Sequence, residues 1–216
     1  MIRPPVHHTR ASGGFTLIEL MIALVIGLLI IGATVTVFVS NQQTSRVKTE
    51  LGNAQEAFRF ASQTIMRVVQ QGSAIQNPGS DLLQVEVPPG EGRMDCLGRA
   101  VDATIDRSIN TFLIADGQLR CEVLLVRTDG TEVTTIETLV EGLDAGRSAF
   151  TFGIANVANG YWSDNSQWVL AGLVPVDDWL NVRSVRVRLA KQAGGDAIGA
   201  TSIFSATMRC GALDIC

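Results

Sequence analysis

Histidine is nearly missing from this 216-residue chain, and the two that occur, His7 and His8, lie within the first ten residues. Beyond them, Ser–His–Asp and Cys–His catalysis have no imidazole base to use. The chain also lacks the nucleophile-elbow, phosphate-loop and dinucleotide-binding glycine motifs. We therefore expect a protein that is not an enzyme and that uses no cofactor.

Runs of lysine or arginine are also missing, and the formal net charge is −4. A surface that neutralises several phosphates needs clustered positive charge. The sequence therefore predicts no nucleic-acid partner.

Cysteine is scarce and widely spaced, and none of it forms a Cys-x-x-Cys pair. These spacings do not offer a zinc site, so we expect no metal. Four cysteines in an oxidising compartment would instead form two disulfides, and three pairings are possible. We favour Cys96 with Cys121 and Cys210 with Cys216, because each pair is local in the sequence and encloses turn residues. The crossed pairings and buried free thiols remain alternatives.

One long apolar run contrasts with the ordinary composition of the rest. Phe15 to Val39 is a stretch of 25 residues in which Glu19 is the only charge. A helix of this length can cross a bilayer. A carboxylate inside such a helix costs several kcal/mol unless it is paired or protonated, which makes Glu19 a candidate functional residue.

A short leader precedes this run. Residues 1–14 are basic, contain no acid and end in Gly13-Gly14, and Phe15-Thr16-Leu17-Ile18-Glu19-Leu20 follows at once. An ordinary secretory signal would place its cleavage site after the apolar stretch, and no convincing site follows here. The combination resembles the type IV prepilin signal, in which a glycine precedes Phe-Thr-Leu-Ile-Glu.

The resemblance implies that a prepilin peptidase cuts between Gly14 and Phe15 and methylates the new amino group of Phe15. Glu19 then becomes the fifth residue of the mature chain, where the family's glutamate is thought to pair with a neighbouring subunit's N-terminal amine. The resemblance further implies an inner-membrane anchor with a cytoplasmic N-terminus and a periplasmic C-terminal domain, which later joins a pilus. A plain signal-anchor helix with a stray glutamate is the alternative.

The helical pattern continues beyond the apolar run, and no proline occurs between Phe15 and Asn77. A narrow apolar seam at spacings of four and three predicts one helix from Phe15 to Gln71, with Gly72 as its C-cap. We expect four segments: a leader (residues 1–14), a transmembrane half-helix (15–39), an amphipathic half-helix (40–71) and a globular β-rich domain (72–216). The residues of the seam are Val47, Leu51, Ala54, Phe58, Ala61, Ile65 and Val68.

Strand patterns replace helical ones from Leu82 onward, so we expect an α+β fold in which the helix packs on a mostly antiparallel sheet. Asp129-Gly130 predicts a two-residue hairpin turn. In Val182–Leu189, apolar residues alternate with arginines, which predicts a strand with one buried face. The expected strands are 119–127, 131–139, 148–155, 182–189 and 202–208.

Four segments of the domain resemble the minor pilin PilW group in composition and order. They are Asp95-Cys96-Leu97-Gly98, the Leu119-Arg120-Cys121 region, Leu139–Leu143, and Trp179 with the 182–189 strand. The resemblance implies a minor subunit that helps to prime pilus assembly near the tip, with the peptidase, other minor pilins, the major pilin and membrane lipid as partners. Residues 208–216 depart from the group, which weakens any assignment there.

Two other functions stay open. A J-class pseudopilin of a type II secretion system has the same strand pattern and the same mechanics in a different machine. A tip adhesin that binds an unidentified ligand belongs to another functional class.

Overall fold

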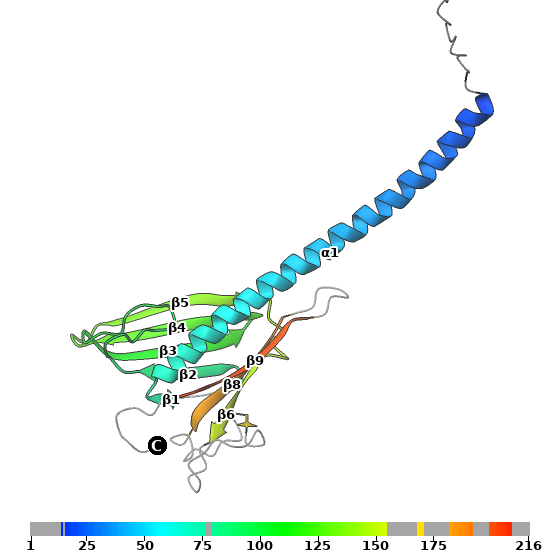
Figure 1. Cartoon of the computed structure of the whole chain (residues 1–216). Helices are drawn as coiled ribbons and strands as arrows, with labels where there is room; N and C mark the ends of the chain where they lie inside the picture. Colours follow the sequence, from blue (N-terminus) through cyan, green and yellow to red (C-terminus); the bar gives the residue numbers. More distant parts are fainter. Residues whose placement is uncertain are drawn as a thin grey trace, which may run out of the picture. The chain divides into compact units, whose positions relative to one another are not determined.

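The computed structural model describes residues 14, 16–76, 79–154, 168–170, 182–191 and 199–208. The chain divides into two compact units, Met1–Thr49 and Glu50–Cys216. One long helix, α1, begins in the first unit and ends in the second, which also contains the strands found among the described residues (Figure 1).

Helix α1 runs from Leu17 to Gln71 without a break and contains 55 residues. Its end at Gln71 is the predicted one, and Phe15 lies outside the described residues. From Ala54 onward the predicted seam is buried, but Val47 and Leu51 remain 48% and 40% exposed. The part of the helix that packs on the domain therefore begins at Ala54, about two turns later than the apolar pattern suggests.

The first sheet is antiparallel and contains five strands in the order β1-β2-β3-β4-β5. Its strands are β1 (Ala74–Gln76), β2 (Leu82–Val87), β3 (Ile105–Ala115), β4 (Gln118–Arg127) and β5 (Glu132–Glu141). Neighbours along the chain are neighbours in the sheet, and the long connection in this sheet is the one from β2 to β3, residues 88–104.

The second sheet is also antiparallel and has the order β7-β6-β8-β9. Its strands are β6 (Ala149–Ile154), β7 (Trp168–Val169), β8 (Val182–Ala190) and β9 (Thr201–Thr207). The predicted strands 148–155, 182–189 and 202–208 correspond to β6, β8 and β9. The alternation in β8 is confirmed, because Val185, Val187 and Leu189 are fully buried and Arg188 is exposed.

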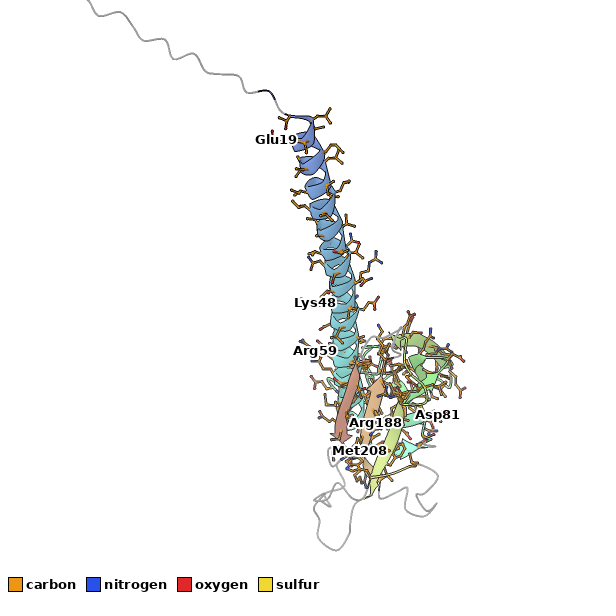
Figure 2. All side chains as sticks on the ribbon, turned by 90° about the vertical axis from the view of Figure 1, so that its right-hand side faces the viewer. Glu19, Lys48, Arg59, Asp81, Arg188 and Met208 are labelled. Carbon is orange, nitrogen blue, oxygen red and sulfur yellow. A yellow bond between two sulfur atoms is a disulfide. The ribbon has the colours of Figure 1, made fainter. Side chains whose placement is uncertain are left out.

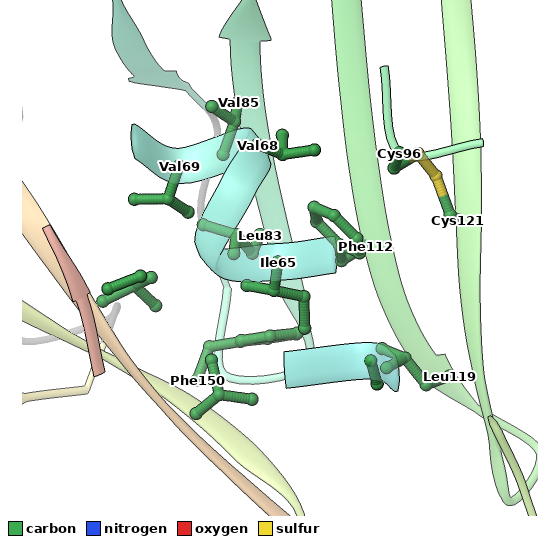
Figure 3. Packing of buried hydrophobic residues seen from close by; sticks show 14 of the residues in the cluster. Ile65, Val68, Val69, Leu83, Val85, Cys96, Phe112, Leu119, Cys121 and Phe150 are labelled. Atoms are coloured by element: carbon green, nitrogen blue, oxygen red, sulfur yellow. A yellow bond between two sulfur atoms is a disulfide. The ribbon is translucent and has the colours of Figure 1, made fainter. Parts of the chain in front are cut away.

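The core lies where α1 meets both sheets (Figure 3). Ile65, Val68 and Val69 of the helix are fully buried against side chains such as Phe112 of β3 and Phe150 of β6. A fully buried side chain of this size contributes about 1.5–3 kcal/mol. The α+β prediction of a long helix packed on antiparallel strands is confirmed.

The same dipeptide, Asp-Gly, makes two different hairpin turns. Asp116 and Gly117 both have positive φ, at 51° and 70°, and connect the paired residues Ala115 and Gln118 in a tight two-residue turn. Asp129-Gly130, predicted to be such a turn, instead belongs to a longer loop. There the N–H of Gly130 donates to the carbonyl of Arg127 (2.9 Å), and Gly130 has φ of 83°.

The longer loop is held by the carboxylate of Asp129, which accepts from the hydroxyl and the N–H of Thr131. These two hydrogen bonds, the hydroxyl's first, hold the pKa of Asp129 below its ordinary value of 3.8. The two-residue prediction was wrong because a local side-chain bond favours a three-residue loop that ends in a left-handed glycine.

Gly72 directly follows the last residue of α1, where the C-cap was predicted, but it does not adopt the left-handed conformation that is common for such a glycine. Its N–H donates to the carbonyl of Val69 (3.2 Å), and its φ is not positive. A Cβ on Gly72 would lie 2.5 Å from Cγ1 of Val85 on β2 and 3.3 Å from the carbonyl oxygen of Glu86. Glycine is therefore needed for the close approach of the chain to β2.

Replacing Gly72 by alanine should lower the free energy of unfolding by about 1–3 kcal/mol, because it overpacks a tight contact. Gly52→Ala is the control, since nothing lies within 4 Å of a Cβ at that helical position, and it should be neutral or stabilising by up to about 1 kcal/mol. Denaturant unfolding of the full chain in detergent measures both variants. Equal free energies of unfolding for the Gly72→Ala variant and the wild type would contradict this role of Gly72. Adding Val85→Ala to Gly72→Ala should restore part of the lost stability.

Candidate functional site: the first turn of the apolar helix

The first turn of α1 is organised by Thr16, which stands directly before the helix. The N–H of Glu19 donates to the carbonyl of Thr16 at 3.1 Å and to its side-chain Oγ1 at 3.3 Å. The N–H of Leu20 donates to the same carbonyl at 3.2 Å. Thr16 is therefore the N-cap residue, and it satisfies N–H groups that the helix leaves without partners.

Sequence reasoning treated Thr16 only as part of the Phe-Thr-Leu-Ile-Glu signal and missed its capping role. A threonine three residues before a glutamate is the pattern of a capping box, so the sequence did contain the pattern that predicts the N-cap. Glu19, at the third helical position, also places its carboxylate near the positive end of the helix dipole. The same short segment thus carries both the candidate processing signal and the start of the helix.

Glu19 lies near the start of the apolar first half of α1, whose side chains are exposed (Figure 2). The large apolar residues from Leu17 to Val39 that flank it are about half or more exposed, including Leu17 at 80% and Ile18 at 68%. Among the described residues, α1 is long and apolar enough to cross a membrane by length and composition, with a mean hydropathy of 2.8 in its most apolar window. No ion pair to Glu19 occurs within the described ranges.

The hydroxyl groups of this apolar segment are satisfied inside the helix. Thr34 donates to the carbonyl of Ile31 at 2.8 Å, and Thr36 donates to that of Ala33 at 2.7 Å. Hydroxyls bonded in this way do not need water, so they fit a lipid or protein environment. Among the described residues 16–39, Glu19 is the one charged side chain, and it needs a partner from outside the helix.

The other predicted residues are placed as follows. Gly14 is exposed, and a Cβ at this position would meet nothing within 4 Å, whereas Phe15 lies outside the described residues. Cys96 and Cys121 form a disulfide, which is the pairing favoured from the sequence. Cys210 and Cys216 also lie outside the described part of the chain. Within that part, no group of three or more histidine, cysteine or acidic residues could hold a metal ion.

Comparison with known families identifies a prokaryotic N-terminal methylation motif at residues 9–35. No curated protein matches the chain. The motif, together with the apolar helix, supports a structural protein of the type IV pilin or pseudopilin kind. It implies processing by a prepilin peptidase, and it is consistent with membrane anchoring followed by association with pilus components.

Gly14→Leu should block processing, because the expected scissile bond joins Gly14 to Phe15 and a bulky side chain there would hinder the peptidase. The variant should accumulate in the membrane at the mass of the full precursor, as seen by immunoblot. Gly27→Ala, at an open position inside the helix, is the control and should be processed normally. Normal conversion of Gly14→Leu to the shorter form would exclude this site.

Proposed function

We propose that this chain, whose N-terminus carries the methylation motif of type IV pilin-like proteins, is a minor pilin of the PilW group. A prepilin peptidase cleaves it between Gly14 and Phe15 and methylates Phe15. The mature subunit waits in the inner membrane with its domain in the periplasm, and then primes pilus assembly near the filament tip together with other minor pilins and the major pilin.

The observation that carries this proposal is the pairing of a methylation motif with an exposed apolar stretch of α1, residues 17–39, in which Glu19 is the single carboxylate. Lipid can cover the apolar surface while the subunit is a monomer. In a filament, the helices of neighbouring subunits would cover the same surface. One helix can therefore serve both states without refolding.

In this proposal, Glu19 fixes the axial position of each subunit relative to its neighbour in the filament. Cleavage would create an ammonium group at Phe15, one turn of helix before Glu19 on the same side. In apolar surroundings both charges are costly when isolated, and a contact between Glu19 and a neighbour's Phe15 amine would remove both costs together. Because Glu19 has no ion-pair partner in the described part of its own chain, a neighbour is the natural source.

The assignment to the PilW group is supported by the organisation of the Asp95-Cys96-Leu97-Gly98 segment. Cys96 is bonded to Cys121 of β4, and Gly98 has φ of 80°, a conformation that favours glycine. The disulfide thus joins two of the segments that resemble the group, those that contain Cys96 and Cys121. A J-class pseudopilin would use the same N-terminal mechanics in a secretion system.

Glu19→Ala should leave cleavage and membrane insertion intact, because losing a charge makes insertion easier. Incorporation into sheared filaments should fall roughly tenfold to a hundredfold, since a charged hydrogen bond is worth about 1.5–3 kcal/mol. Quantitative immunoblotting of the filament fraction measures this. Glu50→Ala, an exposed acid in the polar half of α1, is the control. Wild-type incorporation of Glu19→Ala subunits would overturn the pairing.

Deleting the gene that encodes this chain distinguishes a minor pilin of a type IV pilus from a pseudopilin of a type II secretion system. A minor pilin predicts loss of surface pili, measured by electron microscopy, with protein secretion unchanged. Intact pili with a failure of secretion would instead identify a pseudopilin. Restoring the wild-type chain on a plasmid is the control for both readouts.

A further inference from the structure

Residues Arg93–Arg99 form a compact loop, here called the clasp, that is organised around one buried carboxylate. Asp95 is fully buried, and its Oδ1 accepts from the N–H groups of Leu97 and Arg99, both at 2.9 Å. Its Oδ2 accepts from Nε of Arg99 at 2.8 Å. A carboxylate with three donors holds a loop in one shape.

The clasp is fastened to the five-stranded sheet by a covalent bond and by buried polar side chains. Cys96 is joined to Cys121 of β4, and both residues are buried (Figure 3). The N–H of Cys96 donates to Oδ1 of Asn110 on β3 at 2.8 Å, and Nδ2 of Asn110 donates to Oγ of Ser108 at 3.2 Å. Asn110 and Ser108 are fully buried.

The other side of the clasp holds the end of α1 through three hydrogen bonds. Nη2 of Arg67 donates to the carbonyl of Asp95 at 3.2 Å. The N–H of Met94 donates to Oε1 of Gln71, and Nη1 of Arg93 donates to the carbonyl of Gln71, both at 3.1 Å. The last turn of α1 contains no basic residue, so Arg93 provides the positive charge that a helix C-terminus favours.

From this arrangement we infer that the Cys96–Cys121 bond is a redox-dependent lock on the last two turns of α1. Oxidation fixes the clasp to β4, and the fixed clasp holds Arg67 and Gln71. In the reduced protein the clasp keeps its polar contacts with the sheet and the packing of Leu97 against the core, but it loses its covalent bond, and these turns open more often. The apolar contacts of Ile65, Val68 and Val69 remain in both states, so the change is local opening rather than separation of the helix.

The hydrogen bonds in and around the clasp leave some buried donors without an acceptor. Nε of Arg67 and Nη2 of Arg99 are buried and have no hydrogen-bond partner among the described residues. Buried donors without partners favour rearrangement towards water. The covalent bond opposes this rearrangement, which is why its loss should be felt at the helix.

The chemical step is thiol–disulfide exchange. The thiols of Cys96 and Cys121 lose two protons and two electrons in total and form one S–S bond. The disulfide of a periplasmic dithiol oxidoreductase accepts them and becomes two thiols. Because both sulfurs belong to buried residues, the exchange has to occur before the clasp closes. The disulfide therefore forms only in a domain that has folded in an oxidising compartment.

Hydrogen–deuterium exchange of the full chain in detergent tests the lock without any need for a pilus, so its failure is distinct from failure of the proposed function. In the Cys96→Ala/Cys121→Ala variant, amides of residues 64–72 should exchange about tenfold faster than in the oxidised wild type. Amides of β8 and β9 should keep their rates.

Gln71→Ala tests the helix side while the disulfide stays intact. It should accelerate exchange in the same peptide, and Gln71→Glu, which keeps the acceptor for Met94, should restore slow exchange. Gln70→Ala is the matched control and should change little. Unchanged rates at residues 64–72 in the double-alanine variant would overturn the lock, as would equal acceleration in both sheets, which would show general destabilisation instead.

Discussion

The apolar first half of α1 is left exposed by the described part of the chain. From Leu17 to Val39 its large side chains stay about half or more exposed, and the core of the domain begins only at Ala54. A surface of this size in water would cause aggregation, so the helix has to be covered by lipid or by other helices. The capped first turn and the hydroxyls bonded inside the helix meet the requirements of such an environment. The carboxylate of Glu19 does not, and it therefore needs a partner there.

The second half of α1 meets the opposite requirement, because it has to be held firmly by the domain. It supplies fully buried residues such as Ile65 and Val68 to a core that both sheets share. Its end is further fixed by the close approach of Gly72 to Val85 and by the hydrogen bonds of Arg67 and Gln71 to the clasp. A subunit that is anchored through one end of a helix needs the other end to be fixed in its own domain.

Much of this could be predicted from the sequence, because the signals were local. The end of α1 at Gln71, the strands β6, β8 and β9 and the Cys96–Cys121 pairing depend on periodicity or on cysteine spacing. Strand β3 was missed because Ser108 and Asn110 occupy inward-facing positions and interrupt the apolar alternation. Those two polar residues face inward because Asn110 supports Cys96, a contact between segments that sequence pattern does not reveal. The reason for a glycine at position 72 could not be predicted either, since it comes from Val85 on another element.

In the function proposed above, the leader is removed and Phe15 becomes the N-terminus of an assembled subunit. Mass spectrometry of the N-terminal peptide, from the protein isolated from its native membranes and filaments, tests it most directly. We expect a peptide that begins with N-methylated Phe15 and contains Glu19. A peptide that begins at Met1, or at any residue other than Phe15, would contradict it.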